Sequence, residues 1–535
     1  MQTHLANTLK QSDALRREGH WSRARDGYLQ VLSQVPSNAI VAHNAALCHL
    51  ALGEADQALA RSRQALELDP ALWQSALVHA KALITRGDKA RALALLEKLH
   101  ARRPDNAEIA IELGRLMLQH GGDAAYAAQL AEPFLHGSYE REARLLLLIS
   151  QLYDRPGQVT AADLSSGITA FSDAHMQLPG QAQLPPAPKR RERLRVGLLS
   201  PQFTTSPVYF FTYGALERLA QEVDLVFFSR GRKVDWGTAA FRSLASDWID
   251  VSQASSQALA DTLTRHALDV LIDLGGWMDP VALQALSSKP ARRLYKWVGG
   301  QSATTGLRVF DGFITDRYQT PAGTDHLYSE PLLRLKSGYV TYTAPPYLPK
   351  PRKPRRRQIH LGVIANPTKV SRGFLADLRK RWPAWQAAQA KQGRDIALRF
   401  IDYRYQNGAL RQRVQTALPG VEMAFITPTS HLDYLTAVGQ LDATLDSWPY
   451  SGGLTTIEAL ALGVPAYTRL GELFCERHTV AHCRYAGMRL VEFDLDHFDG
   501  FAAQARSGRA LLRADSARVD HDALADELLS HLLRQ

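Results

Sequence analysis

Cysteine and long apolar segments are scarce in this sequence. Its 535 residues include three cysteines, Cys48, Cys475 and Cys483, which are too few for a disulfide framework and are typical of a reducing compartment. No apolar run reaches the roughly 20 residues that a membrane-spanning helix needs. Residues 1–21 also lack the basic and then apolar pattern of a secretory signal. The sequence therefore predicts a cytoplasmic protein without a membrane span.

Features of nucleic-acid binding are missing as well, although the net charge is +10. The basic residues gather in two short runs, 188–195 and 350–357, which border proline-rich stretches and are typical of solvated linkers. No aromatic residues alternate with them to form a base-stacking platform. We therefore expect no nucleic-acid partner, but the positive field of these runs would favour an anionic ligand nearby.

A 34-residue repeat runs through the first part of the chain. Glycine recurs at positions 19, 53, 87 and 121, proline at 36, 70 and 104, and alanine at 24, 58 and 92. This spacing resembles the tetratricopeptide repeat, in which glycine closes the turn between paired helices, alanine permits their close crossing and proline follows the second helix. It predicts an all-α superhelix over 1–154, closed by a helix over 139–154. Such a groove commonly holds an extended polypeptide, and a purely structural scaffold is the alternative.

The rest of the chain alternates short apolar runs with helical segments, which is typical of parallel sheets covered by helices. After a linker over 155–192, a first lobe is expected over 193–349 and a second over 358–535, with the basic linker 350–357 between them. The expected strands are 195–200, 224–229, 269–274, 293–299, 360–365, 396–401, 421–426, 442–447 and 465–470. The fold class is therefore α/β with an N-terminal all-α repeat, and a ligand cleft is expected at the carboxyl ends of both sheets.

The stretch 450–467, YSGGLTTIEALALGVPAY, predicts a helix with an exposed N-terminus. Gly452 and Gly453 permit close backbone approach, and Thr455 and Thr456 add hydroxyl donors to N–H groups that have no partner inside the helix. An anion could bind there, and an ordinary strand-to-helix turn is the alternative. Neither lobe has a Gly-x-Gly-x-x-Gly after its first strand, which argues against a dinucleotide oxidoreductase.

Three segments carry a resemblance to one family: RLRVGLLSPQF (193–203), FDGFITDRYQTP to YSEPLLRL (310–335) and the stretch from LDATLDSWPY to FCERH (441–478). Together with the repeats they resemble the O-GlcNAc-transferase family of protein glycosyltransferases, whose catalytic module consists of two Rossmann-like lobes in the GT-B fold. The resemblance spans essentially the whole chain. It implies metal-independent, inverting transfer of a sugar from a nucleotide-sugar donor to Ser or Thr of a polypeptide held by the repeats, with no other cofactor. Some bacterial flagellin glycosyltransferases share this arrangement, so a flagellin or another surface protein is a candidate acceptor.

The same resemblance implies roles for individual residues. Lys369 matches a lysine on the donor diphosphate, where its charge would stabilise the leaving group. Thr455 matches a threonine that holds the diphosphate, and His431 a histidine beside the base or leaving group. Glu458 stands where the family carries an aspartate on the ribose, and Asn366 occupies a polar position next to the donor.

Other positions depart from the family pattern. Ser206 precedes Pro207 where the family often has a histidine, Gly453 replaces the histidine before the donor helix, and Trp277 occupies the GGWMDP turn. These departures leave the sugar and the nucleotide open. They also support an alternative hypothesis, in which the chain is a non-catalytic repeat adaptor with a degenerate transferase module.

Two further sets of side chains invite a chemical interpretation. Cys475, His478, His482 and Cys483 lie at helical spacing and Asp494 and Asp496 form Asp-x-Asp, but we expect no metal site, because a GT-B leaving group is stabilised by basic residues and a helix dipole. Asp273 and Asp316 end expected strands at the cleft. Asp273 is the candidate general base, and capping of its own strand end is the alternative.

Overall fold

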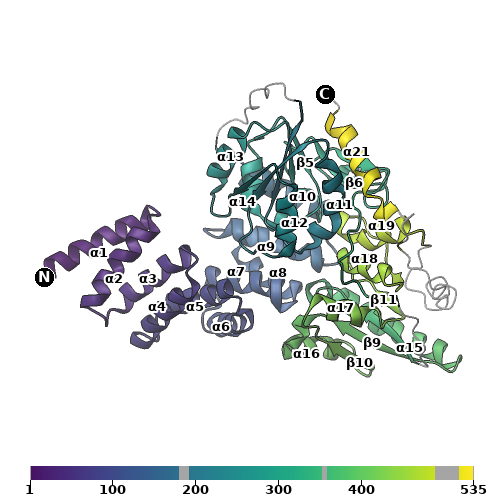
Figure 1. Ribbon diagram of the computed structural model, residues 1–535. Helices are drawn as coiled ribbons and strands as arrows, with labels where there is room; N and C mark the ends of the chain where they lie inside the picture. Colours follow the sequence, from purple (N-terminus) through teal and green to yellow (C-terminus); the bar gives the residue numbers. More distant parts are fainter. Residues whose placement is uncertain (1, 180–191, 352–357, 489–511, 513–516, 534–535) are drawn as a thin grey trace. The chain divides into compact units, whose positions relative to one another are not determined.

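The computed structural model describes residues 2–179, 192–351, 358–488, 512 and 517–533. Contacts divide the chain into two compact units, Met1–Leu147 and Leu148–Gln535. The first unit is built from paired helices, and the second contains two parallel sheets (Figure 1). In these described ranges, no helix combines the length and apolar character that crossing a membrane requires.

The first unit has the helix pairs that the 34-residue spacing predicts. Gly19, Gly53 and Gly87 adopt left-handed φ angles of 80°, 77° and 94° between paired helices, a conformation that glycine takes without steric cost. Alanines 24, 58 and 92 are fully buried where the helices cross. The helices are α1 (Gln2–Arg17), α2 (Trp21–Gln34), α3 (Ala39–Ala51), α4 (Ala55–Leu68), α5 (Trp73–Arg86), α6 (Lys89–Arg102), α7 (Ala107–Leu116), α8 (Ala124–Ala131) and α9 (Glu140–Tyr153).

The fourth copy of the repeat departs from the pattern at its turn. After α7 the chain forms a π-helical turn, Met117–Gly121, which holds one more residue per turn than an α-helix does. The left-handed position consequently moves to Gly122, whose φ is 67°, although the spacing placed the turn glycine at Gly121. Helix α9 then begins in the first unit and ends in the second.

The first lobe of the second unit is a parallel sheet with the strand order β3-β2-β1-β4-β5-β6-β7. Its central strands coincide with the apolar runs, so that Arg195 pairs with Asp224 and Val196 with Val270. The strands are β1 (Arg195–Ser200), β2 (Asp224–Ser229), β3 (Asp247–Asp250), β4 (Val270–Asp273), β5 (Arg293–Lys296), β6 (Gly312–Asp316) and β7 (Leu332–Leu335). Edge strands β3 and β7 were not expected, because strands that stay partly exposed lack a continuous apolar run.

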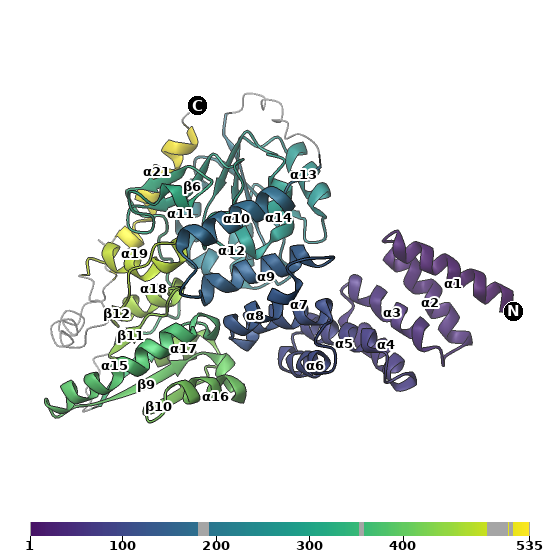
Figure 2. The same cartoon turned by 180° about the vertical axis from the view of Figure 1, so that it is seen from behind.

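The sequence-based prediction of a linker over 155–192 is wrong for part of that range, because residues Ala161–His175 form helix α10. Thr160 and Asp163 make a reciprocal capping box at its start. Leu164, Ile168 and Phe171 on its inner face are buried. The helix therefore belongs to the covering of the first lobe (Figure 2), together with α11 (Pro207–Leu219), α12 (Trp236–Leu244), α13 (Ser256–Arg265) and α14 (Pro280–Leu286).

The second lobe is a parallel sheet with the order β10-β9-β8-β11-β12. Its strands are β8 (Gln358–Val363), β9 (Asp395–Ile401), β10 (Met423–Ile426), β11 (Ala443–Leu445) and β12 (Ala466–Tyr467). Its helices are α15 (Arg372–Ala390), α16 (Gly408–Ala417), α17 (His431–Val438), α18 (Leu454–Ala461) and α19 (His478–Tyr485). Most of the basic linker predicted at 350–357 lies outside the described residues.

The last helix, α21 (His521–Leu533), returns to the first lobe. Leu524, Leu528 and Leu532 are part of the same buried cluster as the α11 side chains Val208 and Leu216, and Figure 1 shows α21 in yellow beside α11. At the polar side of α21, the Glu527 carboxylate accepts the backbone N–H groups of Lys336 and Ser337. The chain therefore crosses from the first lobe to the second and back.

Candidate donor site between the two lobes

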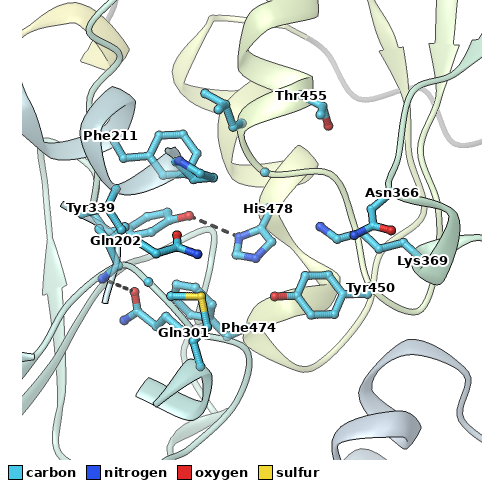
Figure 3. A pocket seen from close by; sticks show the side chains of 18 residues that line it. Gln202, Phe211, Gln301, Tyr339, Asn366, Lys369, Tyr450, Thr455, Phe474 and His478 are labelled. Carbon is cyan, nitrogen blue, oxygen red and sulfur yellow. Dashed lines mark hydrogen bonds between the residues drawn. The ribbon is translucent and has the colours of Figure 1, made fainter. Parts of the chain in front are cut away.

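A cavity of about 320 Å³ lies within the second unit, lined by both lobes. Its walls come from loops that follow strand ends, because Gln202 follows β1, Gly299 and Gly300 follow β5, and Asn366 follows β8. Carboxyl ends of parallel strands are the usual place for ligands in such sheets. Figure 3 shows Asn366 and Lys369 on one side of this cavity, Gln202 and Phe211 on the other, and His478 between them.

The start of α18 forms one part of the cavity wall, through Gly453, Leu454 and Thr455. Gly453 at the N-cap has no side chain that could cap the first turn. Its carbonyl oxygen accepts the N–H groups of Thr456 and Ile457, which leaves those of Leu454 and Thr455 without an acceptor inside the helix. Asp446, after β11, fixes the preceding turn by accepting the N–H of Gly452 at 2.7 Å. Burial raises the pKa of Asp446 to about 6. The helix N-terminus without a side-chain cap, which the sequence predicts, is therefore present at this cavity.

Lys369 reaches the cavity from a short 3₁₀ turn, Pro367–Lys369, that Asn366 caps by accepting the N–H of Thr368 at 3.1 Å. Its Nζ donates to the backbone oxygen of Ser451 at 2.9 Å and lies 4.1 Å from the centre of the Tyr450 ring. Burial lowers the pKa of Lys369 to about 8, and the nearby Asp446 and Cys475 act in the opposite direction. The structure thus brings together Asn366, Lys369, Gly453 and Thr455, all predicted from the sequence.

His431 and Glu458, also predicted, are not among the residues that line this cavity, but they contact each other. The Nε2 of His431, at the start of α17, lies 2.7 Å from Oε1 of Glu458, and its Nδ1 lies 3.0 Å from the hydroxyl of Tyr347. Glu458 is buried one helical turn after Thr455, and burial raises the pKa of its carboxyl group while His431 opposes that rise. The two residues therefore form a polar pair next to the cavity, one helical turn along α18 from Thr455.

Gly452 and Thr456 support the turn and do not face the cavity. The Thr456 hydroxyl lies 2.8 Å from that of Thr479 in α19. A Cβ atom at Gly452 would come within 2.5 Å of the Thr456 hydroxyl oxygen, closer than real Cβ contacts. These two predicted donor-binding residues therefore fix the geometry of the α18 N-terminus without lining the cavity.

Asp273, the sequence-predicted catalytic base, is not placed for that task. Its carboxylate is fully buried, accepts the N–H groups of Gly275 and Gly276 at 2.9 Å each, and lies 3.4 Å from the ammonium group of Lys296. Asp316 is likewise fully buried and accepts two backbone N–H groups of its own turn. A general base must reach the proton that it removes, so both carboxylates are strand-end caps, the alternative that the sequence had left open.

His478 is a cavity residue whose role the sequence did not reveal. Its Nδ1 lies 3.2 Å from the Tyr339 hydroxyl, and burial together with the charges of Lys369 and Arg518 holds the pKa of its imidazole well below the ordinary value. The ring of His482 lies parallel to it, with centroids 6.4 Å apart. The FCERH sequence was the available signal, but Cys475, His478, His482 and Cys483 were considered only as a metal site, which we did not expect, so His478 received no role.

Within the described residues, no three His, Cys, Asp or Glu side chains gather in a way that could hold a metal ion. This finding includes Cys475, His478, His482 and Cys483. Asp494 and Asp496 lie outside the described residues.

Comparisons with known proteins give related sequences and solved structures, but no family model matches the chain. "Probable UDP-N-acetylglucosamine--peptide N-acetylglucosaminyltransferase SPINDLY" of Hordeum vulgare is 26% identical over 341 residues, which are 60% of this chain and 35% of that protein. "Probable UDP-N-acetylglucosamine--peptide N-acetylglucosaminyltransferase SEC" of Arabidopsis thaliana is 29% identical over 159 residues, 28% of this chain and 16% of that protein. The chain thus covers about a third or less of the length of these relatives.

A solved structure of a mutant of Thermobaculum terrenum O-GlcNAc transferase has a similar fold. Its TM-score is 0.66 at 23% identity, over 98% of this chain and 96% of that one. The class is therefore a two-lobed GT-B module behind tetratricopeptide repeats, as the sequence predicted. The predicted resemblance to the O-GlcNAc-transferase-like family, in which SPINDLY and SEC are named, is also confirmed.

Proposed function

We propose that the chain is a protein glycosyltransferase that moves a sugar from a nucleotide-sugar donor to Ser or Thr of a polypeptide. The observation that carries the proposal is the convergence of the Lys369 ammonium group and the uncapped N-terminus of α18 on one cavity at the carboxyl ends of both sheets. Two positive elements at the wall of one cavity suit a diphosphate. The relatives whose names describe peptide glycosylation support the reaction class.

In the proposed reaction, Lys369 and the α18 N-terminus act on the leaving group. As the bond between sugar and phosphate breaks, negative charge grows on the diphosphate, and a preorganised ammonium group and aligned N–H groups stabilise that charge. The Thr455 hydroxyl lies at the same helix end and adds a donor. This stabilisation needs no metal ion at the diphosphate, which is the metal-independent chemistry that the family resemblance implies.

The nucleoside half of the donor is assigned to His431 and Glu458. Glu458 lies one turn beyond Thr455 along α18, and His431 at the start of α17 contacts its carboxylate. Oε1 of Glu458 already accepts from His431, so a ribose hydroxyl would bind to the other carboxylate oxygen or share this one. Phe210 adds an apolar face, with its ring centroid 5.5 Å from that of His431.

The acceptor is assigned to the tetratricopeptide unit, because stacked helical repeats generally form concave surfaces that suit an extended polypeptide. For the identity of the acceptor we propose a flagellin or another bacterial surface protein, modified in the cytoplasm.

A binding screen tests the function. The thermal shift of the full chain is measured with UDP-, GDP-, dTDP- and CMP-sugars, and a flagellin is then incubated with the chain and the nucleotide sugar that stabilises it and is analysed by mass spectrometry. Stabilisation by one donor class and a mass increase on Ser or Thr are expected. No shift with any donor would overturn the proposal in favour of a non-catalytic repeat adaptor.

A further inference from the structure

Three consecutive residues at the end of α9 contact the second lobe. The Tyr153 ring stacks on the Tyr450 ring, with centroids 4.7 Å apart and planes inclined by 18°. The Asp154 carboxylate accepts the N–H of Arg372 at 2.9 Å, and Arg155 lies 2.8 Å from the buried carboxylate of Glu476. All of these residues belong to the second unit. The end of α9 is therefore fixed to the lobe that carries Lys369.

Tyr450 connects the end of α9 to Lys369. Its ring contacts Tyr153 and also lies 4.1 Å from the Lys369 ammonium group, while its hydroxyl lies 2.9 Å from that of Ser302 in the first lobe. An ammonium group over an aromatic face is attracted by the ring quadrupole. The Tyr450 ring, together with the Ser451 carbonyl oxygen that accepts from Nζ, therefore holds the charge of Lys369 in the cavity.

We propose that Tyr153 is a positioning residue for Lys369: by stacking on Tyr450 it keeps that ring in the plane over which the ammonium group lies. The inference rests on the proposed function, because it assigns a role to Lys369 in binding the donor diphosphate. Without the Tyr153 ring, Tyr450 keeps its hydroxyl contact with Ser302 but loses the partner that holds its plane. The long lysine side chain then samples more rotamers, and its charge meets the diphosphate less often.

Asp154 and Arg155 explain how a residue so far from Tyr450 in the sequence keeps this position. Arg372 is the first residue of α15, and the N-cap of that helix, Ser371, follows Lys369 by two residues. Asp154 thus holds the helix start that adjoins Lys369, and Arg155 holds Glu476, whose carboxylate accepts backbone N–H groups of Glu472 and Leu473. The three contacts together fix the end of α9 to Tyr450, to the start of α15 and to Glu476.

A double-mutant cycle tests the proposal, with UDP, GDP, dTDP and CMP as probes titrated calorimetrically into the full chain. Tyr153→Leu keeps apolar volume but removes the ring, and we expect it to weaken binding of the recognised nucleotide about fivefold, within the coupling typical of contacting residues. Tyr153→Phe keeps the stacking and should bind like wild type. In the Lys369→Ala background, Tyr153→Leu should have no further effect, because its action passes through the lysine.

The matched control is Tyr213→Leu, which removes a partly buried tyrosine that stacks on another tyrosine, Tyr209, at 4.8 Å and contacts no lysine among the described residues. It should leave affinity unchanged. A loss in Tyr153→Leu that persists undiminished in the Lys369→Ala background would overturn the positioning role, and so would wild-type affinity in Tyr153→Leu when Lys369→Ala binds weakly. If Lys369→Ala itself binds like wild type, or if no probe binds the wild-type chain, the proposed function fails and this inference fails with it.

Discussion

The two lobes contribute unlike walls to the same cavity. The first lobe offers mainly apolar side chains such as Val208, Phe211 and Met278, together with the backbone of Gly299 and Gly300. The second lobe offers the ammonium group of Lys369, the amide of Asn366 and the N-terminus of α18. Because a diphosphate presents only charged oxygens whereas a sugar also presents apolar C–H faces, we expect the second lobe to bind the diphosphate and the first to shape the sugar side.

The largest effect is expected for Lys369→Ala, which tests whether the second lobe binds the diphosphate. Losing one preorganised donor to developing charge typically slows a reaction by about a hundredfold or more, so we expect transfer, measured by mass spectrometry of the acceptor, to fall at least that far. Phe211→Leu on the opposite wall should leave nucleoside-diphosphate affinity within about twofold and change the KM for the nucleotide sugar instead. Equal losses of diphosphate affinity in both variants would show that the walls do not divide the donor in this way.

The pH dependence follows from the same lysine. Its pKa of about 8 means that the ammonium group is charged below that pH and loses its proton as the pH rises through it. Asp446, Cys475 and His478 are the other titratable groups whose charge couples to it. We expect kcat/KM, which reports the free enzyme, to be constant near neutrality and to fall by about tenfold for each pH unit well above 8. A kcat/KM that stays level to pH 10 would contradict the assignment of Lys369.

Glu458→Gln tests the proposed nucleoside contact, one turn beyond Thr455 in α18. A charge-assisted hydrogen bond contributes about 1.5–3 kcal/mol, so calorimetric affinity for the nucleoside diphosphate should fall about tenfold. Stability should not fall at neutral pH: burial raises the pKa of Glu458, and an acid with a raised pKa in the fold loses stability as the pH rises, which the neutral amide avoids. Glu472→Gln, an exposed glutamate of the same lobe, is the control and should match wild type.

The smallest expected effect is a difference in the free energy of unfolding between alanine substitutions at two adjacent glycines before α18. A Cβ at Gly452 would meet the Thr456 hydroxyl at 2.5 Å, whereas at Gly453 the nearest atom, in the Phe211 ring, is 3.8 Å away. Gly452→Ala should therefore lower the free energy of unfolding by about 1–3 kcal/mol, and Gly453→Ala should change it by less than about 0.5 kcal/mol. Chemical denaturation measures both, and equal losses would argue against the turn geometry described for Asp446 and Thr456.

The second-lobe wall was largely predictable because its residues are close in sequence. Gly453, Thr455 and Glu458 lie in one strand-to-helix stretch, and Asn366 and Lys369 lie in one turn, so local pattern and family resemblance suffice to identify them. The central strands were predictable for the same reason, since a strand buried on both faces is a continuous apolar run.

The remaining features depend on contacts between distant parts of the chain. A carboxylate at a strand end can face the cleft or cap its own turn, and only the burial of Asp273 against Lys296 distinguishes the two. The contacts of His478 with Tyr339 and of Tyr153 with Tyr450 join separate segments. Helix α10 was missed because its serine and glycine residues weaken helix propensity, although its capping box is present in the sequence.

The return of α21 to the first lobe sets an order of events during synthesis. Leu524, Leu528 and Leu532 fill the same buried cluster as residues more than 300 positions earlier, such as Val208 and Leu216. A nascent chain that has emerged only as far as the second sheet still has an open apolar surface on α11. The first lobe therefore completes its core only after the last helix has left the ribosome, so a chain truncated before α21 leaves the earlier of the two lobes unfinished.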